Sequence, residues 1–157
     1  MAISTLIQKY GMSHIRSQMK RMSQEGAADP VVITLAQNIV KSNPARDIYD
    51  WVKANMKYVP DPVDTELFYH PRLLVQEYHK EMPIQGDCDD MAMFTYALLT
   101  AAGVRARIVL LGINGSEPDH ASAQIWSENL QEWIFCDTST SVYPFGWNEK
   151  YVSMEVI

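Results

Sequence analysis

Residues 86–109, GDCDDMAMFTYALLTAAGVRARIV, decide the fold that this sequence predicts. A cysteine, Cys88, stands among three aspartates at the start of a segment that carries almost no polar side chain as far as Ala102. A long apolar run of this kind predicts a helix that is buried on nearly all sides, and Gly103 lies where such a helix ends. The alternating residues that follow, from Val104, predict a half-exposed strand beside it.

Helix chemistry explains the aspartates next to Cys88. Asp87 is predicted as the N-cap and Asp89 and Asp90 as first-turn residues, because the helix dipole favours all three. The unpaired N–H groups at this helix end stabilise a thiolate and a developing oxyanion, whereas the carboxylates oppose ionisation of the thiol. A reactive Cys88 therefore needs a histidine as base and ion-pair partner, and the alternative interpretation is a small core residue.

Among the four histidines, strand parity favours His120. Residues 120–126 and 132–137 predict two strands of a hairpin. If His120 pairs directly with Asp137, Trp126 lies opposite residue 131, and a carboxylate stands beside the imidazole to fix its tautomer. A slip of one residue would place the two side chains on opposite faces.

The same register turns Cys136 to the other face of the sheet, away from Cys88. A disulfide or a redox pair of these two cysteines is therefore disfavoured. In a chain without a signal peptide, two cysteines are more often free thiols than a disulfide framework.

The rest of the chain predicts a helical first half and a strand-rich end. Apolar spacing predicts a helix over residues 3–22, with a kink at Gly11. Asp-Pro and Asn-Pro pairs predict two further helix starts, and a short helix is expected near residues 72–79. The positions of the two pairs are Asp29-Pro30 and Asn43-Pro44.

Length and composition predict one domain over residues 1–157, with a helical N-terminal extension (1–45) before a core (46–145) that holds Cys88, His120 and Asp137. The chain is 47% hydrophobic and has a formal net charge of −6, which disfavours nucleic acid and anionic membranes as partners. Because no signal peptide or membrane-spanning run is seen, a cytoplasmic location is expected.

Taken in order, these motifs resemble the transglutaminase-like superfamily of papain-type cysteine enzymes. The resemblance rests on the block GDCDDMAMFTYALLTAAGVRARIV, on His120 and on WIFCDTST, and it covers about residues 45–145. The upstream segments WVKANMKYVPDP and ELFYHPRLLVQ resemble small members that phages or prophages encode. In one respect the chain departs from the family, because ASAQIW follows His120 where an aromatic or large β-branched residue is commoner.

The resemblance implies an α+β fold in which the buried nucleophile helix packs on an antiparallel sheet. It implies Cys88 as nucleophile, His120 as general base and acid, and Asp137 as the residue that orients the imidazole. The implied chemistry is acyl transfer at a peptide or protein amide through a thioester, without a cofactor, and hydrolysis is preferred to crosslinking. For the side chain that helps to bind the oxyanion, Tyr69 is the first choice, followed by His70 and Gln85.

Other interpretations stay open. Asp137 could be a turn former in DTST, His120 could be a loop residue, and an inherited but inactive site would make the protein a binding or assembly module, including a part of a phage particle. Three aromatic residues could line a substrate groove or form core and cross-strand pairs. These aromatic residues are Trp126, Trp133 and Tyr143.

Five carboxylates near Cys88 and His120 suggest a metal site at first sight. Their spacing fits neither an EF-hand loop nor a zinc set, so we expect no metal. They are Asp87, Asp89, Asp90, Glu117 and Asp119.

Overall fold

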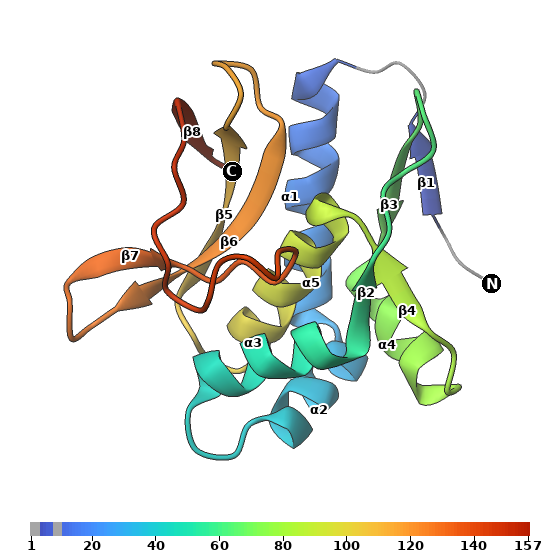
Figure 1. The fold of residues 1–157 in the computed structure, drawn as a ribbon. Helices are drawn as coiled ribbons and strands as arrows, with labels where there is room; N and C mark the ends of the chain where they lie inside the picture. Colours follow the sequence, from blue (N-terminus) through green and yellow to red (C-terminus); the bar gives the residue numbers. More distant parts are fainter. Residues whose placement is uncertain (1–3, 8–10) are drawn as a thin grey trace.

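The computed structural model describes residues 4–7 and 11–157 (Figure 1). Its helices are α1 (Met12–Ala28), α2 (Pro30–Ile39), α3 (Pro44–Asn55), α4 (Pro71–His79) and α5 (Cys88–Ala101). Its strands are β1 (Ser4–Ile7), β2 (Met56–Tyr58), β3 (Glu66–Tyr69), β4 (Ile84–Gly86), β5 (Ala106–Gly112), β6 (His120–Ser127), β7 (Glu132–Phe135) and β8 (Ser153–Val156).

Helix α5 lies at the centre of the molecule, as its apolar sequence predicts. An antiparallel sheet of order β7-β6-β5-β8 lies on one side of it, and the short pairs β1-β3 and β2-β4 lie on the other (Figure 1). Helices α1, α2, α3 and α4 also pack against α5. The predicted α+β architecture, with a helical first half and a buried helix on an antiparallel sheet, is confirmed.

The predicted helix starts in the first half are confirmed by their caps. The Asp29 carboxylate accepts the Val31 N–H at 2.8 Å at the start of α2, and the Asn43 side chain accepts the Arg46 N–H at 3.3 Å at the start of α3. In both helices proline occupies the first turn, where its missing N–H costs nothing.

The helix predicted over residues 3–22 is wrong in its first part. The structure has strand β1 at Ser4–Ile7, and α1 begins only at Met12, after Gly11 in an extended conformation. Residues 3 and 8–10 of that prediction lie outside the described part of the chain. Strand β1 pairs with β3, which is distant in sequence, so local periodicity carries no sign of this pairing.

The register of the β6–β7 hairpin differs from the prediction by two residues. Trp126 lies opposite Trp133, and Ser127 lies opposite Glu132, so the loop shifts toward the C-terminus. A shift of two preserves the side-chain parity that a shift of one would reverse. The pairing ends at Gln124 and Phe135, so His120 at the start of β6 and Asp137 beyond the end of β7 lie outside the paired register, but their side chains still meet at 2.7 Å.

The predicted orientation of Cys136 relative to α5 is wrong. Cys136 is fully buried in the main hydrophobic core beside Ile125 and residues of α5. Cys88 packs at the edge of a second cluster that includes Ala121, so both cysteines lie on the α5 side of the sheet. Each is nevertheless a free thiol, as predicted.

Candidate active site

The start of helix α5 places Cys88. The Asp87 carboxylate accepts the N–H groups of Asp89 and Asp90 at 3.0 and 3.3 Å, and the Asp90 carboxylate accepts the Asp87 N–H at 3.2 Å. This capping box confirms the predicted roles of the aspartates. Among residues 4–7 and 11–157 no group accepts the Cys88 N–H, which the cap does not use, so it can bind an anion at the helix end.

A glycine is required just before the cap. A Cβ atom on Gly86 would lie 2.5 Å from the Asp90 Cβ, which is far closer than van der Waals contact. Asp90 itself is fully buried and also accepts the Tyr69 N–H at 2.8 Å. Gly86 therefore lets strand β4 approach α5 so closely that the Asp90 carboxylate can accept both the Tyr69 N–H of β3 and the Asp87 N–H.

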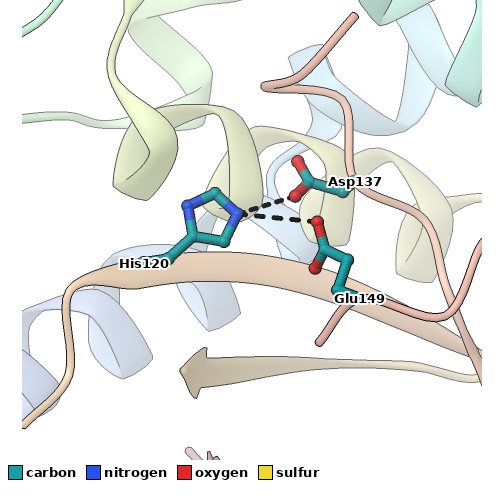
Figure 2. A group of neighbouring side chains, drawn as sticks. All are labelled: His120, Asp137 and Glu149. Atoms are coloured by element: carbon teal, nitrogen blue, oxygen red, sulfur yellow. Dashed lines mark hydrogen bonds and ion pairs between the residues drawn. The ribbon is translucent and has the colours of Figure 1, made fainter. Parts of the chain in front are cut away.

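His120 and Asp137 form a close pair. The His120 Nε2 and Asp137 Oδ2 atoms are 2.7 Å apart, and the Asp137 side chain is 4% exposed (Figure 2). The other oxygen of Asp137 accepts the N–H of Ser139 at 2.8 Å and its hydroxyl at 2.6 Å. Burial raises the pKa of Asp137, but the hydrogen bonds from His120, Glu149 and Ser139 outweigh it and hold this pKa well below its usual range.

This pairing defines the chemistry of the imidazole. With Nε2–H donating to an ionised Asp137, Nδ1 is the nitrogen that can accept a proton. His120 is the first residue of β6, so its side chain lies at the end of the sheet nearest to the start of α5.

Cys88 and His120 line one cavity of about 270 Å³. The cavity has an apolar wall from α1 and β5 and an acidic wall from the cap of α5 and neighbouring loops. Its other lining residues are Met12, Ile15, Met19, Tyr58, Glu66, Asp87, Asp89, Leu110, Pro118 and Asp119. Within the described residues, the thiol donates to Asp89 Oδ1 at 3.8 Å and makes no hydrogen bond to the imidazole.

The local charges oppose ionisation of the thiol. Burial, followed by Asp89 and Asp87, raises the pKa of Cys88 well above its ordinary value. Burial and neighbouring acids also raise the pKa of Asp87 to about 7 and that of Asp89 to about 8. In this conformation burial and the acidic cap favour the neutral thiol at pH 7, in line with the predicted opposition of the aspartates to ionisation.

The three side chains predicted to support an oxyanion are not in this cavity. Tyr69 and Gln85 line a separate cavity of about 200 Å³ between β3, β4 and residues 59–62, which follow β2. His70 caps α4, where its Nδ1 accepts the Arg72 N–H at 3.1 Å. These positions follow from the pairing of β4 with β2, which turns the Gln85 side chain away from the start of α5.

Tyr58 is the tyrosine that lines the Cys88 cavity, and the sequence analysis missed it. It lies opposite Gly86 in the parallel pair β2–β4, immediately beside the cap of α5. Burial and then the neighbouring Cys88 raise its pKa, so the phenol is a proton donor at neutral pH. The only signal in the sequence was its place within residues 51–62, which carried part of the family resemblance.

The predicted aromatic groove is not supported by the structure. Trp126 and Trp133 form a cross-strand pair with ring centroids 5.6 Å apart, and Arg105 stacks on both. Tyr143 stacks on Trp147 with centroids 6.2 Å apart. None of these residues lines the described cavity beside Cys88, because the tryptophans lie toward the far end of β6 from His120.

In the described part of the chain, two groups of side chains bring possible metal ligands within 4.8 Å of one another. They are Asp61, Glu66 and Asp87, and His120, Asp137 and Glu149. In the second group the separation of 2.7 Å between His120 and Asp137 is a hydrogen-bond distance. Two ligands of one tetrahedral ion with bonds near 2 Å lie about 3.3 Å apart, so this geometry is that of a shared proton. The absence of a metal stays a prediction.

A model of the transglutaminase-like superfamily matches residues 33–138, two thirds of the chain. The chain belongs to the transglutaminase-like superfamily. The match includes Cys88, His120 and Asp137. No curated protein matches the sequence.

Solved structures of low sequence identity share the transglutaminase-like fold. A "putative cysteine protease" from Cytophaga hutchinsonii has a TM-score of 0.54 at 16% identity, over 98% of this chain and 62% of its own length. A "putative protease" from Parabacteroides distasonis has a TM-score of 0.50 at 10% identity, over 73% of this chain and 25% of its own length. This transglutaminase-like chain thus spans less than two thirds of either protein. In the described residues, no helix is both long and apolar enough to cross a membrane.

Proposed function

We propose that this transglutaminase-like protein catalyses acyl transfer at an amide bond, with Cys88 as nucleophile, His120 as general base and acid, and Asp137 as the orienting residue. The observation that carries the proposal is that Cys88 and His120 line the same cavity while Asp137 holds the far side of the imidazole at 2.7 Å. Membership of a superfamily of cysteine enzymes supports it.

The reaction begins with a neutral thiol. His120 Nδ1 removes the Cys88 proton as the sulfur attacks the substrate carbonyl, and the Cys88 N–H binds the oxyanion that forms. Tyr58 is the candidate for a second donor to that oxygen. The imidazolium then gives its proton to the leaving amine, and a thioester remains on Cys88. Water, activated by His120, releases the acid and restores the thiol, so the net reaction is hydrolysis of a peptide or amide.

Hydrolysis and transfer differ only in the nucleophile that resolves the thioester. The leading proposal is that the protein is a peptidase or amidase. We further propose that it is cytoplasmic and is encoded by a phage or prophage. The resemblance of the upstream segments, such as residues 51–62, to small phage- or prophage-encoded members of the family supports this preference. The test measures release of new amino termini from a peptide mixture and, in parallel, incorporation of a fluorescent primary amine into the same peptides.

The variants Cys88→Ala and His120→Ala give the decisive comparison, with Cys136→Ser as the matched cysteine control. We expect both active-site variants to lose at least about a thousandfold in turnover and the control to keep it, because Cys136 is buried away from the cavity. Full turnover by Cys88→Ala would end the proposal.

A second candidate function is a binding or assembly module that keeps the fold without turnover. The raised pKa of Cys88 favours it, because the free protein does not hold a thiolate ready to react. Stoichiometric capture of a peptide by the wild type, with no cleavage and no amine incorporation, would establish this function instead.

A further inference from the structure

Glu149 is a buried acid that the three-residue site does not account for. It lies in the segment between β7 and β8, and its side chain is only 2% exposed. Its Oε1 lies 3.8 Å from His120 Nε2 (Figure 2), and one side-chain N or O atom from each of His120, Asp137 and Glu149 lies within 4.8 Å of the other two. A hydrogen bond between the two carboxyls contributes to the lowered pKa of Asp137 and to the raised pKa of Glu149. Its Oε2 is buried without a hydrogen-bond partner. A carboxylate in such a place is costly unless it is neutral or paired with a cation.

The protons of this cluster can be assigned from its contacts. Asp137 accepts from His120 and from Ser139, so its negative charge is stabilised on two sides. Two carboxylates in contact cannot both ionise in a buried site, and the one with fewer donors keeps the shared proton. That carboxyl is Glu149, whose pKa is raised to about 9 by burial and by Asp137.

We infer that Glu149 is a positioning residue, whose carboxyl donates a hydrogen bond to Asp137 and so holds this carboxylate in the orientation that fixes the His120 imidazole. The inference rests on the proposed function and adds a fourth residue to its machinery. Glu149 acts through Asp137, and the charged groups that face it are Asp137 and His120. The family motifs could not reveal it, because it lies after residue 138, where the family match ends.

Two substitutions distinguish a role of Glu149 as a hydrogen-bond donor from a role in packing alone. Glu149→Gln keeps the shape and supplies an amide N–H to Asp137, whereas Glu149→Leu keeps most of the volume and supplies no donor. We expect Glu149→Gln to retain most of the wild-type kcat and Glu149→Leu to lose at least about tenfold in kcat with little change in KM, because misplaced catalytic groups cost rate.

The pH dependence of kcat tests the donor role of Glu149, because a residue that only fills space would not change it. Above about pH 9 wild-type Glu149 loses the proton that it donates. We therefore expect wild-type kcat to fall toward that of Glu149→Leu, and Glu149→Gln to lack this component of the decline. Equal activity of Glu149→Leu and wild type, or equal loss in both variants, would overturn the inference.

A measurement without substrate keeps this inference separate from the proposed function. Nitrogen NMR of the ring of His120 reports its tautomer in the full-length protein. We expect the Nε2–H form in the wild type and in Glu149→Gln, and a mixture of tautomers in Glu149→Leu. If no protein turns over a peptide but this pattern holds, the proposed function fails and the inference stands. Stoichiometric zinc in the purified protein, lost in Glu149→Gln, would overturn the inference by making Glu149 a ligand.

Discussion

At Cys88, two local effects act in opposite directions. The helix dipole and the Cys88 N–H at the start of α5 favour an anion, whereas burial and the carboxyls of Asp87 and Asp89 favour the neutral thiol. The second effect prevails in the free protein. Under the proposed function, the thiol would therefore lose its proton only when His120 accepts it during attack on a substrate.

Neutralising Asp89 tests this balance. Asp89→Asn removes a carboxyl that is negative in the alkaline range where the thiol ionises and leaves only a neutral amide oxygen to accept the thiol hydrogen bond, so we expect the pKa of Cys88 to fall by about one unit or more. The measurement is the rate of alkylation by iodoacetamide against pH, in a Cys136→Ser background. Glu128→Gln, a matched change in the exposed β6–β7 loop, should leave the profile unchanged, and an identical profile for Asp89→Asn would contradict the argument.

Asp137 and His120 should differ in the cost of their loss. Asp137→Asn keeps a group beside the imidazole but favours the wrong tautomer, whereas His120→Ala removes the base itself. We expect the loss in kcat to be about ten- to hundredfold smaller for Asp137→Asn than for His120→Ala. Single-turnover kinetics of thioester formation measure both, and a larger loss for Asp137→Asn would exclude a purely orienting role.

At the scale of the element, the α5 start depends on one glycine. Gly86→Ala would drive a Cβ atom into Asp90, so we expect it to lower the free energy of unfolding by about 1–3 kcal/mol. Gly115→Ala is the matched control, since nothing lies within 4 Å of a Cβ there. Urea denaturation of both variants measures the difference, which would vanish if the backbone at residue 86 could move away at little cost.

The elements also show what the sequence alone can predict. Helix α5 was predictable because its caps and its apolar run lie within one continuous stretch. The predicted approach of His120 to Asp137 is seen at 2.7 Å, although the register is two residues off and the same alternation placed Cys136 on the wrong side of the sheet. Strand β1 and the cavity residue Tyr58 were not predictable, because each depends on pairing with a distant segment.

At the scale of the whole molecule, the N-terminal helix is part of the core. Met19 in α1 is fully buried against residues of α5 and β5, and Met12 and Ile15 lie with it along the cavity. The division of the chain into an extension and a catalytic core at residue 45 stays a prediction, but α1 supplies a wall of the candidate site.

The packing of α1 predicts a difference between two methionines on the same helix. Met19→Ala should lower the free energy of unfolding by about 2–5 kcal/mol, as expected for a fully buried side chain. Met12→Ala, near the rim of the cavity, should cost within about 1 kcal/mol. Urea denaturation of the two variants compares them, and equally small losses would mean that α1 detaches readily from α5.

Strand β8, near the end of the sequence, pairs with β5, which ends at Gly112, so this pairing forms only after most of the chain is present. Isolated helices form in about a microsecond. The cavity forms only when α1, α5 and β6, which are distant in sequence, have packed together, and Glu149 takes its place when the segment between β7 and β8 folds. After dilution from denaturant, helical circular dichroism should therefore recover before the environment of His120 does. On the ribosome, the edge of β5 stays unpaired until Ser153–Val156 has been synthesised, and during that interval it is open to pairing with other chains.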